Sequence, residues 1–166
     1  RAGYYLGNLL CSKGRVEEAV RLWEQALPRQ KSLAVLHRNL GRAYWKLHRD
    51  PDRAIARGRA AIAAAPADYK LYYELDCILV DCGLAEERRA LWAGLPADLL
   101  ANDVIAERVA MFHADDGDFE RTLKILGEGW FYPWEIYKGV RLLYVDAWIG
   151  SGILLEREKK FKEAAA

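Results

Sequence analysis

The side chains best suited to acid–base or metal chemistry in this sequence are three histidines, His37, His48 and His113. Catalysis by histidine needs a positioned nucleophile or carboxylate, and zinc binding needs further His or Cys ligands at short spacing. Each histidine stands alone in its part of the chain, and the sequence contains no HExxH, no GxSxG and no glycine-rich phosphate loop. We interpret each as a solvated or packed side chain, and we predict that the chain is not an enzyme.

The cysteines and the acidic pair before Gly117 also give no indication of a metal site. Cys11, Cys77 and Cys82 form no CxxC pair, and the five-residue step from Cys77 to Cys82 places them about 140° apart around a helix. Such cysteines are typical of reduced, small apolar residues in a cytoplasmic protein. Asp115 and Asp116 lack the ligand spacing and the closing Glu of a calcium loop. We therefore expect no metal and no cofactor.

A basic stripe is the remaining candidate for binding. Arg38, Arg42 and Lys46 are spaced i, i+4, i+8, so they share one face of a helix, and we expect all three to be exposed. Two interpretations are open. The stripe is a solvated face, since arginine is abundant throughout residues 38–59, or it binds an acidic partner.

Composition limits the class of protein that carries these side chains. A chain of 166 residues, 52% hydrophobic and 30% charged, can bury a sizeable core as an ordinary soluble protein. Its formal net charge of +1 argues against a nucleic-acid partner. No apolar run approaches the roughly 20 residues that cross a bilayer, so we expect no membrane partner. Because the sequence begins at Arg1 instead of Met, we expect further sequence beyond its ends.

A repeat with a period near 34 residues organises the elements. Equivalent positions, separated by 34, 35, 34 and 42 residues, are Gly7, Gly41, Asp76, Ala110 and Gly152. A second series marks the turn that follows: Gly14, His48, Gly83, Gly117 and Lys159. Apolar residues at three- and four-residue spacing precede each turn, and acidic or polar residues start the next helix. The predicted fold is all-α.

This pattern resembles the tetratricopeptide repeat (TPR) family. The first two units carry its residues best: Gly7, Gly14, Ala19, Trp23 and Ala26, then Gly41, Tyr44, Ala54, Ala61 and Pro66, with one extra residue in the turn 49–51. Units three and four depart from it at Asp76, Arg88, Ala110 and Thr122. The resemblance implies a TPR-like α-solenoid, a right-handed superhelix of stacked antiparallel helix pairs. We expect a single array over residues 1–166, with approximate units 1–33, 34–68, 69–101, 102–128 and 145–166, and an insertion and the start of the next helix at 129–144.

In the TPR family the first helix of each pair lines a concave groove. The resemblance places on it Tyr4 and Asn8, then Arg38, Arg42, Trp45 and Lys46, then Tyr73, together with Cys11, Ser12, Lys70, Cys77, Asp81, Glu107, Met111 and Asp115. Such a groove is basic and aromatic near its start and acidic farther along, which suits a protein or peptide partner with an acidic segment. One TPR subclass grips a C-terminal carboxylate, and Asn8, Asn39 and Lys70 match three of its five positions. Tyr4 and Glu74 replace the first Lys and the Arg, so we expect that clamp to be broken.

The stretch GWFYPWEIYKG, residues 129–139, contains five aromatic residues, Trp130, Phe131, Tyr132, Trp134 and Tyr137. Its glycines and Pro133 exclude one continuous helix through 127–139, and large rings fill gaps between irregularly spaced helices. We favour packing, with a sugar- or peptide-stacking platform and a docking face for a neighbouring domain as alternatives.

The sequence thus predicts a non-catalytic protein–protein interaction module. The insertion also resembles the repeat tails of large bacterial proteins that begin with β-rich, carbohydrate-enzyme-like domains. The alternative is therefore an accessory helical region of a larger carbohydrate-active protein, structural and not catalytic. Oligomeric state is not indicated.

Overall fold

The computed structural model describes residues 2–129 and 138–158, and within them all regular structure is helical. The prediction of an all-α fold is confirmed. The chain divides into two compact units, residues 1–91 and 92–166, and each is described by itself. The five aromatic residues Trp130, Phe131, Tyr132, Trp134 and Tyr137 lie outside the described residues, so their packing role stays a prediction.

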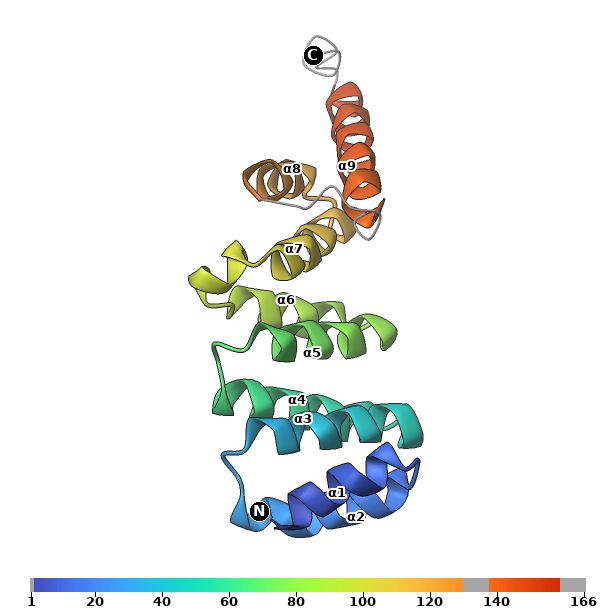
Figure 1. The fold of residues 1–166 in the computed structure, drawn as a ribbon. Helices are drawn as coiled ribbons and strands as arrows, with labels where there is room; N and C mark the ends of the chain where they lie inside the picture. Colours follow the sequence, from blue (N-terminus) through green and yellow to red (C-terminus); the bar gives the residue numbers. More distant parts are fainter. Residues whose placement is uncertain (1, 130–137, 159–166) are drawn as a thin grey trace. The chain divides into compact units, whose positions relative to one another are not determined.

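The first unit is a stack of antiparallel helix pairs (Figure 1). Its elements are α1 (Ala2–Ser12) with α2 (Val16–Ala26), α3 (Ala34–Ala43) with α4 (Pro51–Ala64), and α5 (Tyr69–Asp81) with α6 (Ala85–Ala93). A 3₁₀ turn, η1 (Leu27–Arg29), links the first pair to the second. The helix pairs follow one another in chain order, so α1, α3 and α5 are the first helices of successive pairs.

Glycine closes most of the turns that the repeat predicted. Gly14, Gly83 and Gly117 have φ of 76°, 67° and 78°, a backbone conformation that side chains with a Cβ rarely adopt. In the second pair α3 continues into a π-helical segment, η2 (Tyr44–His48), and Arg49 is the left-handed residue, with φ of 50°. A π turn accommodates one more residue than an α turn. The extra residue of this unit is therefore absorbed before the turn, and the left-handed position falls one residue after His48.

Side-chain caps fix where several helices begin. The carboxylate of Asp50 accepts a hydrogen bond from the backbone N–H of Arg53, and Asp118 accepts one from Arg121. Asn102 accepts from the backbone N–H of Val104. Each cap satisfies a donor that the first helical turn leaves free, which explains the polar residues before the helices.

Small residues let the helices of a pair approach closely. Ala19 and Ala54 have no exposed surface, and Trp23 is 2% exposed. A Cβ at Gly7 would lie 2.3 Å from Nε1 of Trp23, so glycine on α1 makes room for the indole on α2. Leu36 and Leu40 of α3 complete this core without exposure to solvent.

The residues that depart from the TPR pattern in units three and four meet one another in the structure. Nε of Arg88 lies 2.6 Å from Oδ1 of Asp76, and both side chains are buried. In the next pair the Thr122 hydroxyl lies 3.3 Å from the Ala110 carbonyl oxygen and is likewise buried. Asp76 and Ala110 occupy the repeat position that Gly7 has in the first pair. Arg88 and Thr122 occupy the position of Ala19. In the later pairs these two positions are therefore joined by a hydrogen bond.

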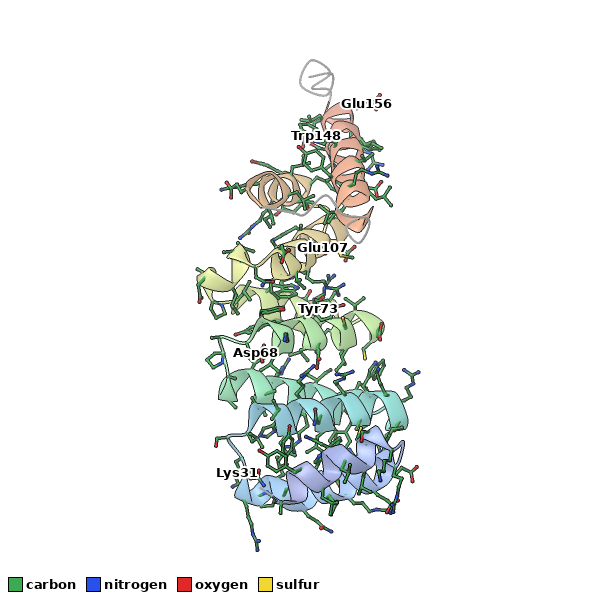
Figure 2. All side chains as sticks on the ribbon, viewed as in Figure 1. Lys31, Asp68, Tyr73, Glu107, Trp148 and Glu156 are labelled. Carbon is green, nitrogen blue, oxygen red and sulfur yellow. The ribbon has the colours of Figure 1, made fainter. Side chains whose placement is uncertain are left out.

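The second unit contains η3 (Ala97–Ala101), α7 (Asp103–Asp115), α8 (Phe119–Glu128) and α9 (Lys138–Arg157). α9 packs on α8, and a Cβ at Gly150 would lie 2.4 Å from the Phe119 ring. Large apolar side chains on α9, including Leu142 and Ile149, are exposed. Trp148 is exposed on the same helix (Figure 2). Within the described part of the chain, no helix is long and apolar enough to span a bilayer.

Candidate functional site

A hollow of about 470 Å³ lies between the first two helix pairs of the first unit. Its lining residues come from α1, α2, α3 and η2: Asn8, Cys11, Ser12, Val16, Trp23, Asn39, Arg42, Ala43, Lys46 and Leu47. The hollow brings together five residues of the predicted groove: Asn8, Cys11, Ser12, Arg42 and Lys46. A second hollow, of about 510 Å³, lies at Ala2, Gly3, Leu22 and Arg29, but none of the predicted groove residues lines it. We therefore treat the first as the candidate site.

Two asparagines join the walls of the hollow. Nδ2 of Asn39 on α3 donates a hydrogen bond to Oδ1 of Asn8 on α1, at 3.1 Å. Within the described residues, the Asn8 amide nitrogen and the Asn39 side-chain oxygen have no protein partner. One donor group and one acceptor therefore remain beside each other, whichever way the two amides are turned.

The basic stripe is only partly available to a ligand. Nε and Nη2 of Arg38 both donate to Oε1 of Glu74 on α5, at 2.9 Å and 2.5 Å. Nη1 of Arg42 lies 3.5 Å from the same oxygen. The hydrogen bonds to Glu74 raise the pKa of Arg38. The expectation that all three cations are exposed is wrong for Arg38, which is half-buried because it is paired across two helix pairs.

The carboxylate of Glu74 is more enclosed than the cations around it. Its side chain is 21% exposed, against 30% for Arg38 and 48% for Arg42. Oε2 of Glu74 is buried, and no described group donates a hydrogen bond to it. A carboxylate in this environment depends on its charged partners, since an unpaired buried charge is costly.

Lys46 contributes an exposed cation to the lining of the hollow. Beside it in sequence, Nε1 of Trp45 donates to Oδ2 of Asp81 at 3.2 Å, and the Arg49 guanidinium lies 5.2 Å from the centre of the Trp45 ring. Trp45 is therefore half-buried in contacts of its own and does not line the hollow. Lys46 and Arg42 are the cations that face it.

The remaining predicted groove residues lie outside the hollow. Tyr4 packs edge-on against Tyr5, and its carbonyl oxygen accepts a hydrogen bond from Nε1 of Trp23. Tyr73 is exposed on α5 (Figure 2). These two residues therefore do not line the candidate site.

Sequence reasoning missed Leu47 and Val16 as lining residues, and it missed the pairing of Arg38 with Glu74. A signal for the pairing was present. Arg38 and Glu74 are 36 residues apart, and so are Trp45 and Asp81. This separation is one residue longer than the local repeat, which is the 35 residues from Gly41 to Asp76. A donor and an acceptor at that separation lie opposite each other on successive first helices.

The cysteines and carboxylates of the described residues provide no metal site. Cys11, Cys77 and Cys82 form no disulfide. Burial, followed by the charge of Asp81, raises the pKa of Cys82. Within residues 2–129 and 138–158 no three His, Cys, Asp or Glu side chains lie together as metal ligands.

Comparison with known proteins connects this geometry to a family. The family model described as TPR repeat matches residues 7–47, which include every residue that lines the hollow. This segment is TPR repeat sequence. The structure of a MamA double mutant, MamA RS-1 ArsTM, is similar, with a TM-score of 0.62 and 15% identity over 99% of this chain and 87% of that chain. MamA AMB-1 gives a TM-score of 0.60 and 20% identity over 98% of this chain and 90% of that one.

These similarities establish the fold of the whole chain as a TPR-like α-solenoid. No curated protein matches the sequence. The weaker resemblance to repeat tails of bacterial carbohydrate-active proteins is supported by none of these comparisons and stays a prediction.

Proposed function

We propose that residues 1–91 bind an extended peptide segment of a protein partner in the hollow between the first two helix pairs. TPR arrays are typically scaffolds for other proteins, and residues 7–47 match the TPR model. The observation that supports the proposal most directly is the hollow itself, with an amide pair on its wall and a lysine beside it. Its volume of about 470 Å³ falls within the range of about 300–1,000 Å³ typical of ligand sites.

The amide pair suits a peptide backbone. The free donor of Asn8 and the free acceptor of Asn39 match the carbonyl oxygen and the N–H that an extended peptide presents. Leu47, Val16 and Trp23 supply an apolar surface next to these amides. A short apolar side chain of the peptide would be covered there while its backbone is held by the asparagines.

Lys46 and Arg42 give the proposed site its preference for acidic peptides. Both line the hollow, and Lys46 is exposed with no ion-pair partner among the described residues. An acidic side chain of the peptide would therefore lie beside Lys46. Partial desolvation in a hollow strengthens such a pair relative to one on an open surface.

A peptide selection tests the function. Random peptides displayed on phage are selected against residues 1–166, and the binding of labelled selected peptides is measured by fluorescence polarisation. We expect Asn39→Ala to weaken binding about fivefold, since one hydrogen bond contributes about 1 kcal/mol. We expect Lys46→Glu to weaken the binding of acidic peptides most.

The matched control is Lys31→Glu, which reverses an exposed charge in the segment between η1 and α3 (Figure 2). This lysine does not line the hollow, so the control should bind like the parent protein. The proposal fails if no selected peptide binds the parent chain. It also fails if Asn39→Ala and Lys46→Glu bind as tightly as Lys31→Glu.

A further inference from the structure

We infer that Glu74 sets the charge specificity of the proposed peptide site, because its carboxylate already occupies the anion position between Arg38 and Arg42. Arg42 lines the hollow, whereas Arg38 and Glu74 lie next to it between the second and third helix pairs. A ligand's acidic group is thereby directed to Lys46 and excluded from the position beside Arg42. The partner class is then a peptide with an acidic residue at one end of its bound segment and a neutral stretch at the other. This inference rests on the proposed function, since it assigns a specificity to the same site.

The geometry makes Glu74 an internal counterpart of a ligand carboxylate. Its Oε1 accepts two hydrogen bonds from Arg38 and lies 3.5 Å from Arg42. These are the contacts that an incoming carboxylate would make with the same arginines. A second carboxylate beside Glu74 would meet a like charge in a partly buried place, and like charges placed together across an interface are strongly disfavoured.

The carboxylate of Glu74 stays beside the two arginines, so it blocks a ligand carboxylate from that position permanently. It is less exposed than either arginine, and its second oxygen is buried. A small hollow of about 20 Å³ beside it is lined mainly by apolar groups such as Leu71, Leu75 and Ile78. Swinging the carboxylate out to release the arginines would break the hydrogen bonds that compensate its burial.

Distance explains why Lys46 escapes the effect. Lys46 lies four residues beyond Arg42, in the π-helical segment η2, and no ion pair joins it to Glu74. Arg42 lies 3.5 Å from Oε1 of Glu74. The repulsion from Glu74 is therefore strongest beside Arg42, whereas at the exposed Lys46 solvent and salt screen it.

The test measures an acidic probe of known composition, fluorescein-labelled hexaglutamate, by fluorescence polarisation against residues 1–166. A neutral glycine–serine hexamer with the same label is the reference. We expect Glu74→Gln to bind hexaglutamate about tenfold more tightly than the parent chain, the change that about 1.4 kcal/mol of added pairing produces. The gain should shrink as salt increases and should disappear in Glu74→Gln/Arg38→Gln.

The matched control is Asp81→Asn, which removes a carboxylate from the same helix that pairs with Trp45 and not with the arginines. If Asp81→Asn strengthens hexaglutamate binding as much as Glu74→Gln does, net charge explains the gain and the inference is wrong. No gain in Glu74→Gln also overturns it. Thermal unfolding checks that the variants are folded.

A second comparison does not depend on the stability of Glu74→Gln. In the otherwise unchanged chain, Lys46→Gln should weaken hexaglutamate binding more than Arg38→Gln, because Arg38 is already paired. The reverse order would contradict the inference. Hexaglutamate binding is independent of the phage selection, so the failure of the inference and the failure of the proposed function are distinguishable.

Discussion

At the scale of single residues, the buried pair of Asp76 and Arg88 shows how this chain tolerates charges at positions that TPRs fill with small residues. Asp76 has no exposed surface and Arg88 is 6% exposed. A buried pair of this kind adds little compared with apolar packing, but breaking it leaves a charge without its compensation. Removing either partner alone is therefore expected to lower the free energy of unfolding.

Asp76→Ala should lower the free energy of unfolding by about 3–5 kcal/mol, since it removes the carboxylate that accepts from Arg88. Urea unfolding measures the change. The control is Asp76→Ala/Arg88→Ala, which restores small residues like Gly7 and Ala19 of the first pair and should be less destabilised than the single variant. A single variant as stable as the parent would mean that the ion pair is not needed.

Glu107 makes a pH-dependent contribution to stability, because its carboxyl is more stable in the protonated form. Its carboxyl lies beside α9, where a Cβ at Gly139 would be 3.2 Å from Oε1. Burial is the main reason that the pKa of Glu107 lies above its ordinary value of 4.5, with the nearby charge of Asp103 adding to the rise and Arg108 opposing it. A raised pKa in the folded state means that folding favours the protonated form.

The stability contributed by protonated Glu107 is therefore fully present below pH 4.5 and is lost as pH rises through the raised pKa. We expect Glu107→Gln to be more stable than the parent protein at pH 7 and equally stable near pH 4. Thermal unfolding at the two pH values measures this. Glu120→Gln, at an exposed position on α8, should show no such difference. Equal melting temperatures of Glu107→Gln and the parent at pH 7 would contradict the argument.

At the scale of the elements, the packing of α9 on α8 depends on one of the two glycines near the middle of α9. A Cβ at Gly150 would lie 2.4 to 2.8 Å from three atoms of the Phe119 ring, whereas a Cβ at Gly152 would meet nothing within 4 Å. Phe119 is half-buried, and its ring would have to shift to admit a Cβ at residue 150. Glycine is therefore required at 150 and only tolerated at 152.

Gly150→Ala should destabilise the protein by about 1–3 kcal/mol through overpacking against Phe119. Gly152→Ala should stabilise it by up to about 1 kcal/mol, because alanine has the higher helix propensity. The two variants change the same atom at neighbouring places, so each is the control for the other in chemical denaturation. Effects of the same sign would mean that α9 does not pack on α8 through Gly150.

At the scale of the whole molecule, the chain divides into two units between residues 91 and 92. This division predicts that a destabilising substitution in one unit affects mainly the stability of that unit. Repeat arrays are stabilised mainly by neighbouring repeats, so a defect weakens its own unit first. The core of the first unit is continuous from α2 through α3 and α4, with Leu36 fully buried near its centre.

Leu36→Ala should cost about 2–5 kcal/mol, from lost transfer energy and the cavity left behind. Hydrogen exchange followed by mass spectrometry should show faster exchange in α1 to α4 than in the parent protein. Exchange in α7 and α8 should change much less. A uniform acceleration through both units would show that the chain unfolds as one cooperative body.

The helix pairs and their turns could be predicted from the sequence because their causes are local. Apolar spacing, glycine at Gly14, Gly83 and Gly117, and polar helix starts all act within a few residues. Among the described turns, the left-handed residue of the second pair is displaced from His48 to Arg49, because an inserted residue can be absorbed as a π turn or as a longer loop. Local sequence does not choose between these two solutions.

The candidate site could be predicted only in part. Asn8, Arg42 and Lys46 line one hollow. That Arg42 and Lys46 share a helix face followed from their spacing within one helix. Which partners they meet depends on how one helix pair is rotated and shifted against the next. That packing brings Glu74 to Arg38, joins Asn39 to Asn8 and leaves a hollow beside Lys46. The sequence by itself determined the helices and their polar faces, and only the tertiary structure decided which charges remain free, because contacts between helix pairs are set by the packing of the whole core.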